Sequence, residues 1–192
     1  ELELGLDMRF FKGRIGMELT WYDKRTTDLI YAIGLPTTTG FSSFYTNLGE
    51  IRNTGWEAAL DLKPVISKNF QWDIRAIYTK NLNTVERLVD GLTRDIIGGF
   101  NYIEPGYPYG YLRGGRSART DDGKLLINPT SGMPFVDPND DMVGDPNAKY
   151  KLGITNTFSF KGISLSVLFY MTKGGSFYSE FISSMFGSGV TR

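Results

Sequence analysis

The sequence predicts an all-β fold, namely part of a large antiparallel transmembrane β-barrel with short periplasmic turns and long extracellular loops. Three observations lead to this prediction. Six segments alternate apolar and polar residues with a period of two, as β-strands do. The connections between these segments alternate between a few residues and long loops. Aromatic side chains gather toward the ends of the apolar stripes, as they do at membrane interfaces.

The six alternating segments form three pairs of predicted strands, which lie near residues 2–30, 55–86 and 149–172. In the first segment, Leu4 and Leu6 share one face, and Glu3 and Asp7 share the other. Each segment keeps this alternation for about nine to eleven residues, which is the length that a tilted strand needs to cross a bilayer. The pattern therefore predicts strands with one apolar and one polar face.

Short and long connections alternate along the chain. The two strands of each pair are joined by a few residues, around Lys12, Ser67 and Lys161. Long loops near 31–54 and 87–148 separate the pairs. A structureless loop as long as the second one is uncommon in a compact soluble domain. Short turns on one side and long, extracellular loops on the other are typical of transmembrane barrels.

The composition excludes several kinds of site. The chain has 192 residues with no cysteine and no histidine, which rules out disulfides, the usual zinc sites and histidine-dependent triads. Lys plus Arg and Asp plus Glu both number 21, so no basic excess favours nucleic acid. We therefore expect no enzyme activity, no cofactor and no nucleic-acid partner, and we assign no catalytic, cofactor-binding or metal-binding residues.

The alternation by itself does not say what covers the apolar stripes. In a soluble β-sandwich, the stripes of two sheets would meet across a core, and such a module could bind carbohydrate. In a membrane wall, the stripes would meet lipid and the charged faces would line a wet lumen. The strand lengths, the aromatic ends and the asymmetric loops favour the membrane wall.

Several stretches resemble a known family. RIGMELTWYDKRTTDLIY, TNLGEIRNTGWEAALDLKPV and FQWDIRAIYTKNLNTVERL resemble successive barrel strands of SusC/RagA-type TonB-dependent outer-membrane transporters. EPGYPYGYLRG and VGDPNAKYKLGITNTFSFKGISLSVLFYMTKGGSFY resemble later segments of that family, in the same order. The resemblance implies a barrel of about 22 strands closed by an N-terminal plug. Residues 1–192 would supply about six of these strands, with the plug, the TonB box and the C-terminal strand expected outside them.

The resemblance also implies a function. It implies active transport of a bulky solute, an oligosaccharide or a peptide, across the bacterial outer membrane, energised through TonB. The implied partners are a SusD-like surface lipoprotein, the TonB complex through parts absent from this chain, and outer-membrane lipid. A passive porin-like or structural barrel would need the same strands, so it stays an alternative at this point.

Aromatic and basic residues in the long loops are the candidate contacts for the ligand or the partner. Their rings can stack on sugar faces or on a partner, and guanidinium groups can bind hydroxyls or carboxylates. The candidates are Phe44, Tyr45, Tyr102, Tyr107, Tyr109, Tyr111, Arg113 and Arg116. The tyrosines could equally pack on one another as the core of a loop.

The acidic stretch 137–145 offers oxygen ligands of the kind that Ca²⁺ prefers. Pro138 and Met142 interrupt the ligand order of an EF-hand loop. Turns built on Asp, Asn and Pro explain the same composition without a metal. The sequence leaves both interpretations open.

Overall fold

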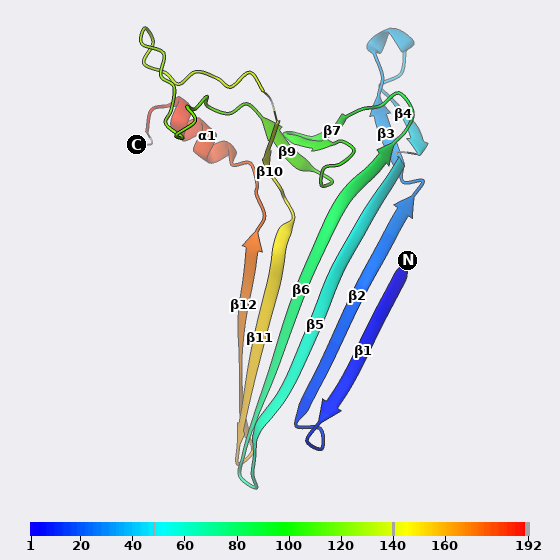
Figure 1. Cartoon of the computed structure of the whole chain (residues 1–192), viewed down its shortest axis with the longest axis vertical. Coiled ribbons are helices and arrows are strands. Elements are labelled where there is room, and N and C mark those ends of the chain that lie inside the picture. Colours follow the sequence, from blue (N-terminus) through cyan, green and yellow to red (C-terminus); the bar gives the residue numbers. More distant parts are fainter. Residues whose placement is uncertain (48, 140, 191–192) are drawn as a thin grey trace.

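The structure, a computed structural model, describes residues 1–47, 49–139 and 141–190. Six long strands stand side by side in one open sheet, and smaller elements gather at one end of it (Figure 1). The strands are β1 (Leu2–Phe10), β2 (Ile15–Thr27), β5 (Gly49–Ile66), β6 (Phe70–Leu88), β11 (Ala148–Phe160) and β12 (Ile163–Gly174). They lie in this order across the sheet, and every neighbouring pair is antiparallel.

Short turns close the three strand pairs at the far end of the sheet from the small elements (Figure 1). The small elements are β3 (Ile30–Gly34), the 3-10 turn Thr37–Thr39, β4 (Ser43–Asn47), β7 (Asp95–Gly98), β8 (Asn101–Ile103), β9 (Tyr111–Gly114), β10 (Asp141–Gly144) and α1 (Glu180–Gly187). β3 and β4 form a hairpin, and β7 to β10 form a separate four-stranded sheet. Among the described residues, no helix is long and apolar enough to cross a membrane.

The register places apolar side chains of all six long strands on one face of the sheet. One row across the sheet consists of Met8, Met17, Leu60, Ala76, Ile154 and Phe169. In the described part of the chain, no second sheet covers this face, and Leu4, Leu165 and Phe169 are 60%, 60% and 63% exposed. This exposed apolar face does not match the soluble β-sandwich considered above, in which the stripes would be buried.

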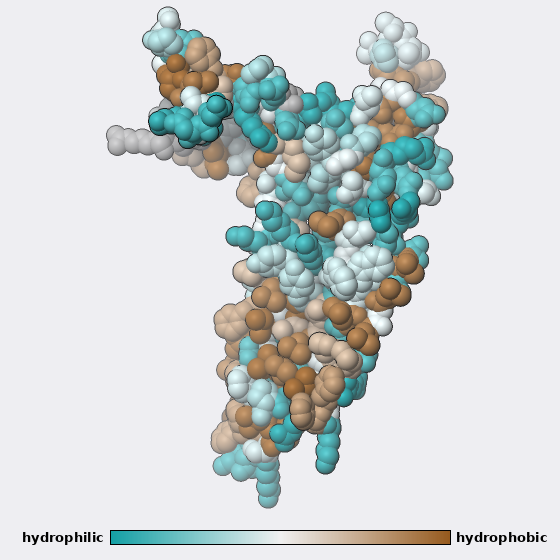
Figure 2. Space-filling view, viewed as in Figure 1, coloured by the Kyte–Doolittle hydropathy of each residue, from teal (hydrophilic) through white to brown (hydrophobic). Residues whose placement is uncertain are grey.

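The apolar side chains form a band that covers only part of the length of the strands. On β6 the band runs from Phe70 to Tyr78. At about 3.4 Å per residue, this stretch is about 27 Å long along the strand. For a strand tilted by about 40°, it is about 21 Å tall, close to the apolar band of outer-membrane barrels. Figure 2 shows these apolar side chains over the lower part of the sheet and hydrophilic ones above them.

Beyond the band, the alternation inverts along β5 and β6. Glu50 and Arg52 lie on the face that is apolar lower down, whereas Ile51 and Val85 lie opposite each other on the inner face, 9% and 1% exposed. The inversion has a physical cause, because the outer face here meets water and the inner face packs against loop residues. β5 therefore begins at Gly49, and residues 49–54 are strand rather than the loop that the sequence predicts.

Gly55 lies where β2, β5 and β6 approach closely on the inner face. A Cβ atom at this position would overlap the Tyr22 ring and the carbonyl oxygen of Lys80. We expect Gly55→Ala to lower the free energy of unfolding by about 1–3 kcal/mol, because the neighbouring strands would have to move apart. The denaturant midpoint of the intact protein in detergent micelles measures this effect.

Gly153 provides the matched control, since it also lies inside a long strand. A Cβ atom there would meet its nearest neighbour, Cδ2 of Tyr170, at an ordinary 3.8 Å. Gly153→Ala is therefore expected to change stability by less than about 0.5 kcal/mol. Equal losses for the two variants would show that the close approach at Gly55 is not the cause.

Candidate functional site

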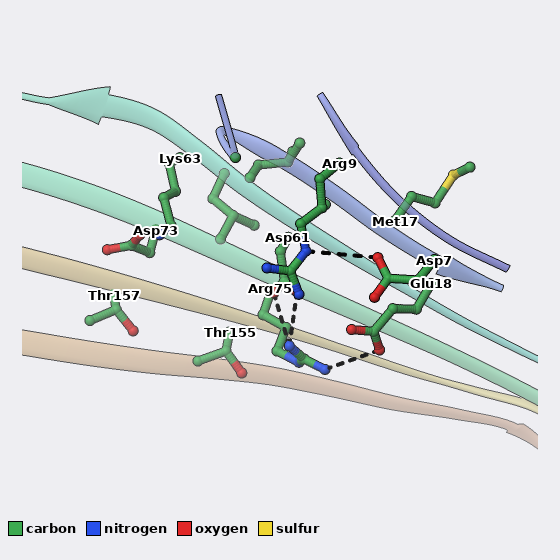
Figure 3. A pocket seen from close by; sticks show the side chains of 14 residues that line it. Asp7, Arg9, Met17, Glu18, Asp61, Lys63, Asp73, Arg75, Thr155 and Thr157 are labelled. Atoms are coloured by element: carbon green, nitrogen blue, oxygen red, sulfur yellow. Dashed lines mark hydrogen bonds and ion pairs between the residues drawn. The ribbon is translucent and has the colours of Figure 1, made fainter. Parts of the chain in front are cut away.

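The inner face of the sheet, opposite the apolar band, holds a cluster of charged side chains in a shallow pocket of ≈ 330 Å³ (Figure 3). Arg75 on β6 lies at its centre, with Nη1 2.9 Å from Oδ2 of Asp61 and Nη2 3.9 Å from Glu18. Arg9 lies 3.8 Å from Asp7 beside them. These pairs are half exposed, so each stabilises the fold by only about 0–1 kcal/mol. Their arrangement makes the inner face polar and wettable.

Uncharged amides line the inner face between this cluster and the small sheet. Tyr22 donates its hydroxyl to Oδ1 of Asn81 at 3.0 Å. The amide groups of Asn81 and Asn83 both donate to Oδ1 of Asn53, at 3.1 and 2.9 Å. Oδ1 of Asn83 then accepts the backbone N–H of Tyr109 at 2.7 Å. This amide ladder (Tyr22, Asn81, Asn53 and Asn83) connects the middle of the wall to the loop above it.

The four-stranded sheet and the turn 104–110 are together called the ledge here. The ledge is hydrogen-bonded to the end of β6 and packs against it. Val85 donates its N–H to the carbonyl of Tyr107 at 2.9 Å and accepts the N–H of Gly106 at 2.8 Å. Val85, Leu88 and Ile103 form a small buried core between β6 and the ledge. The segment 87–148, predicted as a long loop, therefore has ordered structure of its own.

Tyr111 lies at the centre of the ledge and is fully buried. Its ring stacks on that of Tyr107, with centroids 4.6 Å apart, and its hydroxyl donates to Glu104. Arg113 and Arg94 lie 3.4 and 3.9 Å from the same carboxylate. Burial, and then the bond to Glu104, raise the pKa of Tyr111, so the phenol stays a neutral donor. These contacts give Tyr111 the packing role that the sequence left as an alternative.

The other loop tyrosines point in different directions. Tyr102 lies opposite Tyr111 in the β8–β9 pair and remains partly exposed, with the guanidinium of Arg94 5.7 Å from its ring centroid. Tyr109 instead packs against the buried core beneath the ledge. Tyr102, Tyr107 and Arg113 are thus brought together around Tyr111, and Tyr109 is not. Their contact with a ligand stays a prediction.

Phe44 and Tyr45 lie apart from the ledge, on the β3–β4 hairpin. Their side chains are 59% and 71% exposed. The base of this hairpin is tied to the ledge by Tyr31, which donates its hydroxyl to the carbonyl of Ile96 at 3.2 Å. Burial, assisted by the nearby Asp95, raises the pKa of Tyr31 to about 12. The hairpin therefore has a fixed base and two exposed aromatic rings on β4.

Residues 115–139, called the arm here, extend away from the ledge between β9 and β10 (Figure 1). Arg116 donates to the carbonyl of Met142 where the arm begins, and Ser117 pairs with Val136. The arm exposes six large apolar side chains, Leu125, Leu126, Ile127, Met133, Phe135 and Val136. Figure 2 shows apolar side chains on both the arm and the β3–β4 hairpin, far from the apolar band.

The acidic stretch 137–145 makes turns in the structure. Three of its carboxylates accept backbone N–H groups just after them in the chain, Asp137 from Asn139, Asp141 from Met142 and Asp145 from Asn147. Among the described residues, no three acidic side chains converge as a cation site would require. Asp140, which belongs to this stretch, lies outside the described residues.

Residues 1–189 match the family described as "TonB dependent receptor-like, beta-barrel". The chain belongs to this family. TonB-dependent receptor P26 of Formosa agariphila is 29% identical over 203 residues, which cover 93% of this chain and 20% of that protein. TonB-dependent receptor SusC of Bacteroides thetaiotaomicron is 27% identical over 202 residues, which cover 94% and 20%. The chain thus spans about a fifth of the length of these relatives.

Solved structures share the fold of this segment. The RagAB peptide importer in its closed-closed state superimposes with a TM-score of 0.73 at 21% identity, over 90% of this chain and 21% of that chain. The open-open state of the same importer gives 0.72 over 90% and 20%. The predicted fold class and family are therefore confirmed, and the six-stranded sheet is a segment of a TonB-dependent receptor barrel.

Sequence reasoning missed the amide ladder and the pairing of Glu104 with Tyr111. A signal for the ladder is present, because Asn81 and Asn83 occupy alternate positions on the polar face of one strand. No such signal marks Glu104, whose partners are set by how the turn 104–110 folds back on β9.

Proposed function

We propose that this protein takes up a bulky solute, an oligosaccharide or a peptide, by active transport across the bacterial outer membrane. In this proposal the chain supplies part of the barrel wall and of its mouth. Coupling to TonB runs through parts of the transporter outside these residues, and no catalytic step is involved. The family and the likeness to SusC and to a peptide importer support transport, and they leave both solute classes open.

One observation supports the proposal above all others, namely the segregation of the two faces of the wall. The outer face has an uncovered apolar band about as tall as that of outer-membrane barrels, which suits contact with outer-membrane lipid. The inner face has ion pairs around Arg75 and the amide ladder, which suit a wet or filled lumen. A wall that separates lipid from a polar interior is what transport of a polar solute requires.

The same proposal assigns the exposed loops to the mouth of the barrel. The ledge is packed against β6, so it offers a fixed surface there, with Tyr102 and Arg94 partly exposed. The apolar side chains of the arm and the rings of Phe44 and Tyr45 on β4 lie outside the band, where lipid does not cover them. We assign these two surfaces to the docking of a SusD-like surface lipoprotein.

Uptake by energised cells tests active transport against passive diffusion. Cells that make the complete transporter are given fluorescent oligosaccharides or fluorescent oligopeptides, with and without a protonophore. We expect one of the two probes to be taken up by untreated cells, and its uptake to fall to the level of transporter-free cells after the protonophore. Uptake that the protonophore leaves unchanged would show a passive porin and contradict the proposal.

Removing the arm tests its role at the mouth. Ser117 and Val136 pair with each other, so residues 118–135 can be replaced by a short Gly-Ser linker without moving β9 or β10. We expect normal amounts of transporter at the cell surface but at least a tenfold loss of lipoprotein association, because five of the six exposed apolar side chains of the arm are removed, all but Val136. Lys124→Gln at the exposed tip is the control. Unchanged association after the deletion would contradict the assignment.

A further inference from the structure

We propose that Lys80 and Lys173, on the outer face of the wall, together bind the phosphate of a lipid headgroup at the upper edge of the apolar band. The site is distinct from the solute path, because it lies on the opposite face of the sheet from the amide ladder. The proposal concerns the lipid that surrounds the barrel, and it does not depend on which solute is transported.

Both lysines lie on the outer face, directly above the row that holds Tyr78 and Met171. Lys80 follows Tyr78 by two residues on β6, and Lys173 follows Met171 by two residues on β12. Side chains two residues apart in a strand share a face. Because Tyr78 and Met171 belong to the band, the two ammonium groups lie where the hydrocarbon ends and the headgroups begin.

Aromatic side chains occupy the same height. Trp56 lies opposite Lys80, and Tyr150 lies opposite Lys173, with its ring 5.6 Å from that of Tyr78. Tryptophan and tyrosine at this level are typical of the membrane interface. β11 separates the two lysine-bearing strands, so their Cα atoms are two strand spacings, or about 10 Å, apart. Two flexible side chains at this separation can reach one phosphate from both sides.

Two arginines of this face, Arg52 and Arg25, lie beyond the band and are already neutralised by carboxylates. Arg52 makes a two-point contact with Asp23, 2.7 Å at its closest, and lies 3.7 Å from Glu86. Arg25 lies 3.4 Å from Glu50. These arginines therefore have little free charge to offer to a lipid phosphate.

Lys80 and Lys173 differ from these arginines, because neither has an ion-pair partner in the part of the chain that the structure describes. Both are exposed, and Leu82, the next outer residue above Lys80, is apolar. A lysine ammonium binds phosphate as a point charge. Each lysine near an anionic membrane surface is worth about a fivefold gain in binding, so the pair is worth about thirtyfold.

The test measures binding of lipid to the complete transporter in a nonionic detergent. The probes are fluorescent lipid A with its phosphates, the same lipid after dephosphorylation, and inorganic phosphate as competitor. We expect the phosphorylated lipid to bind more tightly than the dephosphorylated one, and its Kd to rise with ionic strength. Inorganic phosphate at the same concentration is expected not to displace it, because the acyl chains also contact the band.

The double variant Lys80→Gln, Lys173→Gln is expected to raise the Kd for the phosphorylated lipid about thirtyfold and to leave that for the dephosphorylated lipid unchanged. Lys151→Gln is the matched control, because Lys151 lies at nearly the same height but pairs with Thr79 on the inner face. An unchanged Kd in the double variant, or equal affinity for the two lipids, would overturn the proposal. Displacement by equimolar inorganic phosphate would show a free-anion site and overturn it as well.

Discussion

Replacing Leu60 by arginine is expected to destabilise the barrel by about 2–4 kcal/mol, because the charge would enter the hydrocarbon near its midplane. Leu60 lies between Met17 on β2 and Ala76 on β6, in a middle row of the apolar band. The loss is measured as the shift in the denaturant midpoint of the complete transporter folded into lipid bilayers. Burying one unpaired charge is one of the few single changes with so large a cost.

Thr20→Arg is the matched control, because it introduces the same residue on the opposite face of the sheet. Thr20 points to the inner face, opposite Glu57 on β5. An arginine there can approach a carboxylate in a polar environment, and we expect a change below about 0.5 kcal/mol. If Thr20→Arg were as harmful as Leu60→Arg, the two faces of the sheet would be wrongly assigned.

Tyr111→Ala is expected to lower the local stability of the ledge by about 3–5 kcal/mol, as is usual when a fully buried aromatic ring is removed. The ring of Tyr107 would lose its stacking partner, and Glu104 would lose a hydroxyl donor. Hydrogen–deuterium exchange of the amides in 101–114 measures the change, since local opening exposes them. Lipoprotein association is expected to weaken in parallel, because the ledge positions the base of the arm.

Two further variants serve as controls. One tests the contribution of the Tyr111 hydroxyl, and the other tests whether losing any aromatic ring has the same effect. Tyr111→Phe keeps the stacked ring and removes the hydroxyl, which donates to Glu104 and accepts from Arg113, with an expected loss of about 1–3 kcal/mol. Tyr45→Ala removes an exposed ring from the hairpin and should leave exchange in the ledge unchanged. Wild-type exchange rates in Tyr111→Ala would contradict the packing role of this ring.

Much of the fold follows from the sequence alone, because alternation is a property of the strand itself. Successive side chains of any strand point to opposite faces, so the stripe through Leu4 and Leu6 needs no knowledge of neighbours. The short turns near Lys12, Ser67 and Lys161 likewise indicate antiparallel pairs. The resemblance of ordered segments to the family then predicts what the stripes face, and the match over residues 1–189 confirms the family.

The upper limit of the membrane band could not be predicted from the same pattern. Residues 49–54 continue β5, but their apolar member, Ile51, faces inward and their charged members face outward. A period-two pattern looks the same in either phase. The residues at which the apolar outer face ends depend on what lies beside each face of the sheet. The loops that fold back against β6 decide this.

The sequence named the candidate residues of the site, but it did not predict which of them would pack together. Tyr102, Tyr107 and Tyr111 lie close together in the chain, and the sequence could not say which ring would be exposed and which would be buried. The turn 104–110 folds back so that Tyr107 covers Tyr111, and this contact depends on the bonds between that turn and Val85. The sequence by itself determined the strands, their two faces and the family. The tertiary structure alone decided which loop residues pack and which remain available, because their packing depends on how the turn 104–110 bonds to Val85 on a different strand.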